Sequence, residues 1–313
     1  MAGLTAGDEL FIYNSQGTNA GDYEFVKIAR VNTYTLDLEA GLFHTYPADD
    51  AVFVYRVPQY TDVIIQEGGT ITANTWNAST GGGVVVFRAS GSISISGTGG
   101  INVSERGYQG HNRQVDEENG YQGEGYLCIG IQSVEPNENG GGGGLYAAGG
   151  GGGGGHAIQG TDGLEGYHPP DGNGLGGLAV GNQELTSLFF GGAGGTGGDN
   201  DGTTAPNPNG GHGGGIIYIA SPTINIKNVL ANGGAGKEGA PGSQDGGSGG
   251  GAGGSILIIS DEVNITGDVT AIGGIGFTPV NAQGGKGGDG SVGRIRINAA
   301  TINGVTIPAA YTD

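Results

Sequence analysis

The chain has 313 residues, and its 30 acidic and 11 basic side chains give a formal net charge of −19. This charge repels DNA, RNA and anionic bilayers, so we expect neither nucleic-acid binding nor membrane insertion. A single cysteine, Cys128, excludes an internal disulfide framework. No stretch approaches the roughly 20 apolar residues of a membrane span. The opening MAGLTAGDELF lacks the basic and apolar regions of a secretory signal, so we expect none in this sequence.

Residues 1–61 predict a small β module. Aromatic and β-branched residues alternate with polar ones over 10–13, 23–28, 34–38 and 52–57, and turn-forming stretches separate these segments. Four or more short strands in this length favour a small antiparallel barrel or sheet. The remainder, 62–313, is a glycine-rich repeat domain. A more distant copy of its repeat, with the same short apolar strands and turn, is expected in VVVFRASGSISIS, at 84–96.

Two segments, 105–139 and 157–190, interrupt the repeat. They are the predicted insertion loops, and insertions in repeat proteins often form the binding face. The second contains the only helix signal, at 182–190, where Asn182 is a candidate cap and Leu185, Leu188 and Phe189 share one face.

Between the insertions lies a run of seven glycines, Gly149 to Gly155. Ordering glycine costs the most backbone entropy, so such a run stays disordered unless its surroundings require the missing side chains. Only glycine allows extended three-residue-per-turn helices to pack closely, and bundled chains of this kind can exchange backbone hydrogen bonds. We therefore expect packed glycine tracts, in which alanine is tolerated only at solvent-facing positions that recur every third residue.

The last hundred residues contain a repeat of 39 residues. Gly215 opens GIIYIASPTIN, Gly254 opens GSILIISDEVN and Gly293 opens GRIRINAATIN. Three copies in one register indicate a repeat architecture. The predicted fold class is therefore all-β: the N-terminal module, followed by a glycine-rich β-solenoid or sandwich with packed polyglycine-type helices.

The order of motifs also resembles a known family. GDELFIYNSQGTNAGDYEF, RVPQYTDVIIQEGGTITANTWNASTGGGVVVFRASG, GYQG and glycine tracts ending in GGSILI and VGRIRI resemble a family of glycine-rich bacterial surface proteins. The tracts are also similar to those of phage tail-fibre tip adhesins. In these adhesins polyglycine helices stack into a sandwich and the intervening loops bind host receptors. This resemblance implies an architecture more than a ligand.

Catalytic and metal motifs are weak. GGSGG at 246–250 and GAGGTG at 192–197 match a nucleophile elbow and a dinucleotide fingerprint, but no helix follows either. We predict no cofactor, and a structural calcium ion is the alternative. GGKGGDGSV at 284–292 nearly fits a calcium-binding nonapeptide, while Asp199 with Asp201, and the acidic stretch 116–118, offer carboxylates. The five histidines and Cys128 show no zinc spacing.

Aromatic residues on the insertion loops are the candidate receptor-binding residues. We predict that Tyr108, Tyr121, Tyr126, Tyr167 and His168 bind a host or cell-surface glycan or protein receptor, because loop aromatics add contact area at little entropic cost. The alternative is a lid of tyrosines over the glycine layer.

The predicted function is non-enzymatic: an extracellular, cell-surface or virion adhesin such as a phage tail fibre. We expect a homo-oligomer or an assembly with other structural subunits. One alternative is a subunit of an extracellular filament or coat, in which the N-terminal module docks to the next subunit. The other is a polysaccharide-degrading β-helix enzyme, since such enzymes place carboxylates along one face.

Overall fold

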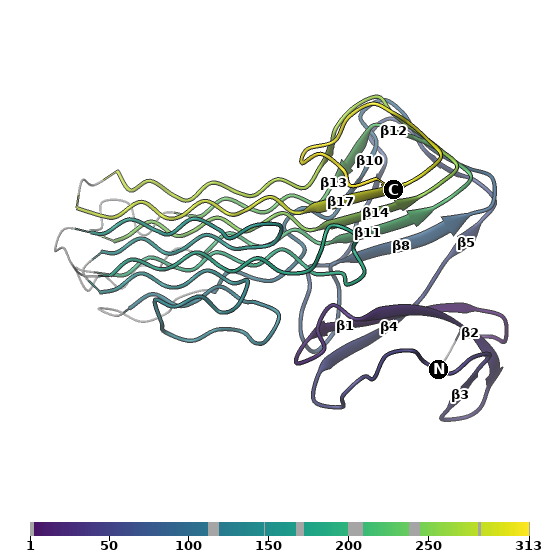
Figure 1. The fold of residues 1–313 in the computed structure, drawn as a ribbon, viewed down its shortest axis with the longest axis horizontal. Helices are drawn as coiled ribbons and strands as arrows, with labels where there is room; N and C mark the ends of the chain where they lie inside the picture. The colour runs from purple at the N-terminus through teal and green to yellow at the C-terminus, as the bar shows by residue number, and fades with distance from the viewer. Residues whose placement is uncertain are drawn as a thin grey trace.

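The computed structural model describes residues 3–111, 119–146, 148–166, 172–199, 209–237, 245–280 and 283–312. Within these ranges the protein is all-β, with eighteen strands and no helix. No segment there forms a helix of the length and apolarity that crossing a membrane requires. Figure 1 shows three parts: an N-terminal sheet, a group of parallel strands above it, and long glycine-rich segments that run side by side away from the strands.

The N-terminal sheet is antiparallel, with the strand order β3-β2-β1-β4. Its strands are β1 (Glu9–Gln16), β2 (Tyr23–Val31), β3 (Leu36–Leu38) and β4 (Ala51–Arg56). Strand β1 is buried on both faces, because its side chains alternate between the two sides of the sheet and a core covers each side. Leu10 and Ile12 pack in a small core on one face, whereas Phe11 and Tyr13 join a larger aromatic core on the other.

Fourteen strands of the described residues form three parallel sheets. The first sheet contains β5 (Gln59–Tyr60), β8 (Val84–Ala89), β11 (Ile216–Ala220), β14 (Ser255–Ile259) and β17 (Arg294–Asn298). The second contains β6 (Val63–Ile65), β9 (Ser92–Ile95), β12 (Thr223–Ile226), β15 (Glu262–Ile265) and β18 (Thr301–Asn303). The third contains β7 (Thr70–Ile71), β10 (Gly100–Asn102), β13 (Asn228–Leu230) and β16 (Val269–Thr270). Each of the first four passes of the chain therefore adds one strand to each sheet, and the last pass adds β17 to the first sheet and β18 to the second. The change from the N-terminal sheet to the parallel sheets falls between Arg56 and Gln59.

The 39-residue spacing is the register of these ladders. Ile217 pairs with Ile256, which pairs with Ile295, so equivalent residues of successive repeats stack directly on one another. The same register places Asn225, Asn264 and Asn303 in a ladder, whose side-chain amides are joined by hydrogen bonds of 3.1 and 2.7 Å. Inward-facing isoleucine and valine side chains from all three sheets form the largest apolar core. Burial of this β-branched stack is the main apolar contribution to the parallel sheets.

A second core joins the N-terminal sheet to the outer face of the first parallel sheet. Phe25 of β2 packs on Tyr218 of β11 with ring centroids 4.7 Å apart. Arg88 of β8 lies over the Phe25 ring, with its guanidinium carbon 4.6 Å from the centroid, and forms an ion pair of 2.8 Å with Glu9. The two sheets are therefore held together by aromatic packing and by a shielded ion pair.

The glycine-rich segments connect the third sheet back to the first. We call the segments 119–125, 139–146, 148–155, 172–177, 191–198, 210–215, 246–254 and 284–293 the glycine array. Its backbone hydrogen bonds run between segments, and consecutive N–H groups turn to different neighbours: Gly150 donates to Leu164, Gly151 to Gly247 and Gly152 to Gly142, at 2.8 to 2.9 Å. Every third residue returns to the same neighbour, as when Gly153 donates to Thr161 and Gly154 to Gly250.

Close packing explains why the array needs glycine. A Cβ atom built on any residue from Gly149 to Gly155 would lie 2.0 to 2.6 Å from a heavy atom of a neighbouring backbone segment. Real Cβ atoms essentially never approach below 3.0 Å. The expectation of solvent-facing positions at every third residue is therefore wrong for this run, which is surrounded on all sides.

The predicted architecture is also wrong, although the described residues are all-β. Within the described ranges no closure of the sheets into a solenoid is shown, and the strand assignments give no support to the predicted polyglycine-type helices. The chain does not return directly from the third sheet to the first. After β13 it continues through 231–237 and comes back through 245–254 before β14 begins. The tracts are assigned to no helix or strand, and their backbone hydrogen bonds join separate segments.

The predicted helix at 182–190 is absent as well. Leu185 has a φ of 49°, which a right-handed helix excludes. The Asn182 side chain accepts the Thr186 N–H at 3.2 Å and fixes a local turn instead. Leu185, Leu188 and Phe190 are buried in the aromatic core, so tertiary packing determines the conformation of this segment.

Candidate functional site

Tyr108 belongs to the core and not to a binding surface. Its side chain is completely buried, and its ring packs edge-on against Trp76 and Phe190, with centroid distances of 5.3 Å to each. Its hydroxyl donates to the backbone carbonyl of Ser15 at the end of β1. The predicted receptor contact for Tyr108 is therefore corrected: this residue fastens the N-terminal sheet to the first insertion.

Tyr121 and Tyr126 are half-buried. The Tyr121 ring stacks on His111, with centroids 4.3 Å apart and an interplanar angle of 11°. The Tyr126 hydroxyl donates to Glu138 at 3.2 Å, and its ring contacts Phe189. Part of each ring remains accessible, so their role in receptor binding stays a prediction. Tyr167 and His168 lie outside the described residues.

The first insertion also presents an apolar surface that the search for aromatic residues missed. Leu127, Ile129 and Ile131 are 44%, 58% and 68% exposed, and they alternate with other residues along one short loop. We call these three side chains the apolar rim. Three exposed aliphatic residues within five positions of an acidic chain are a sequence signal that could have identified this loop.

Polar side chains hold the backbone of this loop in place. The buried Gln122 side chain accepts the Ile131 N–H at 3.0 Å, and the Gln122 N–H donates to the Ile131 carbonyl at 2.9 Å. Asn137 donates to the Cys128 carbonyl at 2.7 Å. Tyr121 and Gln132 form an antiparallel bridge at the base of the loop. The rim is therefore presented on a preorganised backbone, which lowers the entropy cost of binding.

A buried carboxyl group lies behind the loop. Glu124 is 5% exposed, accepts the Gln109 N–H at 2.8 Å and lies 3.4 Å from the Gln16 side-chain amide. Burial raises the pKa of Glu124 to about 7, although both hydrogen bonds oppose the shift. Gln16 also donates to the Gly125 carbonyl at 2.9 Å. These contacts connect the end of β1 to the insertion, and the depth of Glu124 favours a structural role.

Ser255 and His156 resemble a nucleophile and a base but are not arranged as a catalytic pair. Both are buried, with the Ser255 hydroxyl 3.4 Å from His156 Nε2. The hydroxyl donates instead to the Phe189 carbonyl at 2.8 Å. Burial, with a smaller contribution from Arg294, lowers the pKa of His156 to about 3, so the imidazole is neutral. A substrate could not reach either group without opening the core.

The predicted calcium motifs do not converge on a cation site in the described residues. Across these ranges no group of three or more His, Cys, Asp or Glu side chains is arranged to hold a metal. Asp289 of the nonapeptide-like stretch instead binds the Lys286 ammonium at 2.9 Å and the Gly276 N–H at 2.8 Å. Asp201 and the stretch 116–118 lie outside the described residues. The absence of a cofactor remains a prediction.

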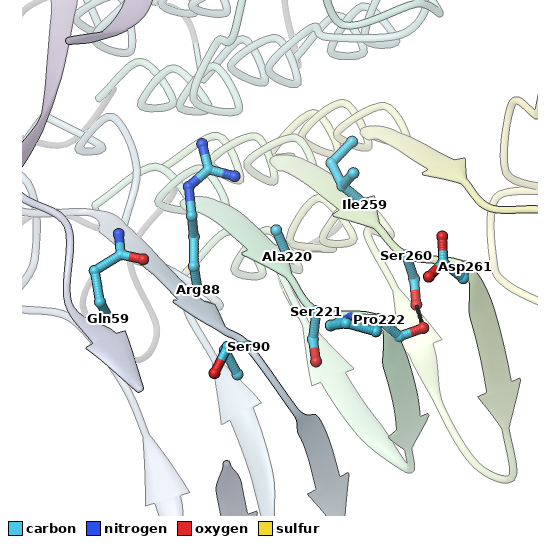
Figure 2. Close-up of a pocket in the computed structure, with 10 residues that line it drawn as sticks. Gln59, Arg88, Ser90, Ala220, Ser221, Pro222, Ile259, Ser260 and Asp261 are labelled. Atoms are coloured by element: carbon cyan, nitrogen blue, oxygen red, sulfur yellow. Dashed lines mark hydrogen bonds between the residues drawn. The ribbon is translucent and has the colours of Figure 1, made fainter. Parts of the chain in front are cut away.

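A groove of about 420 Å³ lies where the strands of the first parallel sheet end (Figure 2). Three successive passes of the chain line it: Arg88 and Ser90, then Ala220, Ser221 and Pro222, then Ile259, Ser260 and Asp261, with Gln59 beside them. Asp261 is the one carboxylate among its described lining residues. Glycoside hydrolysis ordinarily requires two carboxyl groups, so this groove has no complete catalytic set for it.

Comparison of the chain with protein-family models, curated proteins and solved structures gives no match.

Proposed function

We propose that this protein is a non-enzymatic adhesion protein of the cell exterior or of a virion surface, and that the apolar rim contacts its receptor. The observation that supports this proposal is the exposure of Leu127, Ile129 and Ile131 on a loop whose backbone is fixed by Gln122 and Asn137. Exposed aliphatic groups on a rigid loop are costly to leave in water and are typical of protein interaction sites.

Charge favours a partner other than a second copy. Two chains that each carry −19 repel one another, whereas a neutral or basic receptor protein does not. The glycine array supports the same proposal, because its hydrogen bonds between segments make a stiff base for the loop. Tyr121 and Tyr126 lie in the same insertion and offer half-exposed rings next to the rim in sequence.

The test is binding of the labelled protein to a panel of bacterial cells, before and after protease treatment of the cell surface. The variants Leu127→Ser, Ile129→Ser and Ile131→Ser, combined, should lower binding at least about tenfold, because each buried aliphatic side chain contributes about 1.5–3 kcal/mol. Val305→Ser is the matched control, because Val305 is 79% exposed in the C-terminal segment. Equal binding by both proteins would refute a role for the rim.

A second candidate function is a subunit of a filament or coat, supported by the N-terminal sheet. Tyr34 and Phe43 are 90% and 88% exposed there, and the Glu24 carboxylate holds the Phe43 loop by accepting the Phe43 N–H at 2.9 Å. Polymers seen by electron microscopy for the wild type, but not for Phe43→Ser, would favour this assembly. A fall in the viscosity of a host polysaccharide would instead favour an enzyme.

A further inference from the structure

The groove at the strand ends is built from polar groups that the fold already holds in position. The Ser221 hydroxyl donates to the Gly91 carbonyl at 3.0 Å. The Ser260 hydroxyl donates to the Pro222 carbonyl at 3.0 Å (Figure 2). Each bond joins one pass of the chain to the previous pass at the corner between the first and second sheets. The Ser221 oxygen accepts no hydrogen bond from the described residues, and the Ser260 oxygen, which accepts the Glu262 N–H at 3.2 Å, keeps one lone pair for a ligand.

Arg88 is equally constrained. Its Nε donates to Glu9 at 2.8 Å, and one terminal nitrogen donates to the Tyr218 hydroxyl at 3.1 Å. Glu9 also accepts a hydrogen bond of 2.8 Å from the Gln59 amide. The positive charge of Arg88 is therefore balanced within the protein, while the guanidinium still has N–H groups for a neutral acceptor.

Asp261 lies at the other end of the groove and is exposed. Its carboxylate makes no hydrogen bond to the described residues, so it can accept two from a ligand. Alanine and isoleucine side chains, together with Pro222, supply apolar surface between the polar ends. The lining thus combines donors, acceptors and an apolar strip, with no excess positive charge.

We infer that this groove is a binding site for one or two units of a neutral saccharide. Sugar hydroxyls both donate and accept, which suits Asp261, Gln59 and the serine oxygens, and the apolar face of a pyranose suits the strip between them. The volume lies within the usual range of small-ligand sites, about 300–1,000 Å³. Anionic sugars are disfavoured, because Arg88 is neutralised by Glu9 and the whole chain carries −19.

Ligand-observed NMR with the full chain tests the inference. The probes are gluco-, manno- and galacto-oligosaccharides of two to four units, with their uronic-acid counterparts for comparison. Asp261→Asn changes an exposed side chain that makes no hydrogen bond to the described residues, so it should leave the melting temperature unchanged. Asp261→Asn should weaken binding of the responding neutral oligosaccharide about tenfold or more, because hydrogen bonds to a charged group are among the strong ones.

Asp268→Asn is the matched control, since Asp268 is also exposed and lies outside the groove. The inference is overturned if no neutral oligosaccharide binds, if the uronic acids bind better, or if Asp261→Asn and Asp268→Asn behave alike. The site is independent of the apolar rim. Oligosaccharide binding without cell adhesion would therefore support the groove and refute the proposed function. Cell adhesion without oligosaccharide binding would support the proposed function and refute the groove.

Discussion

Alanine substitution within the seven-glycine run measures how tightly the glycine array is packed. A Cβ atom at Gly152 would lie 2.0 Å from the Leu175 carbonyl oxygen, and one at Gly151 would lie 2.4 Å from the Gly195 oxygen. Ordinary contacts begin near 3.4 Å, so the obstructing carbonyl must retreat by about an ångström or more. The Leu175 carbonyl also accepts the Gly142 N–H at 2.8 Å, so its movement strains a second segment.

The expected loss of stability is the balance of two destabilising effects and one stabilising effect. Overpacking typically costs about 1–3 kcal/mol, and loss of a backbone hydrogen bond costs about 0.5–1.5 kcal/mol more. Reduced freedom of the unfolded chain returns only about 0.4–1 kcal/mol. Gly152→Ala should therefore lower the free energy of unfolding by about 1–3 kcal/mol, and Gly151→Ala and Gly153→Ala should behave similarly because each meets a different neighbouring backbone.

Chemical denaturation at a constant m value gives the required comparison. Gly41→Ala is the control, because a Cβ at Gly41 meets nothing within 4 Å and its φ is not in the left-handed region. The control should be neutral or slightly stabilising, by up to about 1 kcal/mol. If Gly151→Ala, Gly152→Ala and Gly153→Ala match this control, the run is not packed as described and the reasoning fails.

Four further predictions concern the aromatic core, two buried titratable groups and metal. Tyr108→Ala should destabilise by about 3–5 kcal/mol in thermal or chemical unfolding, because it empties a buried site, whereas Tyr121→Ala should leave the melting curve nearly unchanged. The folded pKa of Glu124, about 7, exceeds its ordinary value of 4.5, so its contribution to stability is lost as the pH rises between these values. The stability of Glu124→Gln relative to the wild type should therefore increase by up to about 3 kcal/mol from pH 4.5 to pH 8. A stability difference that does not vary with pH would contradict the burial of Glu124. The folded pKa of His156, about 3, lies below 6.5, so its contribution has the opposite slope and is lost as the pH falls from 6.5. The free energy of unfolding of His156→Gln, relative to that of the wild type, should accordingly be higher at pH 4.5 than at pH 7. Chemical denaturation at the two pH values checks this. EDTA should lower the melting temperature by less than about 2 °C, since Asp289 already binds Lys286; a larger fall that calcium reverses would indicate a structural ion.

Local patterns in the sequence predict much of the strand structure. Alternation around Phe11 and Ile12 marks a strand with two different faces, and the structure places those faces in different cores. The spacing of Gly215, Gly254 and Gly293 equals the ladder register, because a repeat that buries its isoleucines must stack equivalent positions. Patterns of this kind are local or strictly periodic, so the sequence alone reveals them.

The burial and the neighbours of residues in the insertions are not predictable from local sequence patterns. Tyr108 and Tyr121 both occur in the motif GYQG, yet one is buried against Trp76 while the other stacks beside His111. No local feature distinguishes the two tyrosines, because their environments are set by segments far away in the chain. A prediction based on loop aromatic residues does not include the apolar rim, because its three side chains are aliphatic.

The amino-acid sequence by itself determined the all-β class, the 39-residue ladder register and the acidic charge, because these depend on composition, alternation and period. Only the tertiary structure decided the architecture. Whether parallel strands close into a solenoid depends on where the chain goes after each strand, and here it leaves through the glycine array. Tertiary structure likewise decides the surroundings of Gly152, the burial of Glu124 and the lining of the groove. Each depends on which distant segments lie side by side, and a sequence pattern does not specify those neighbours.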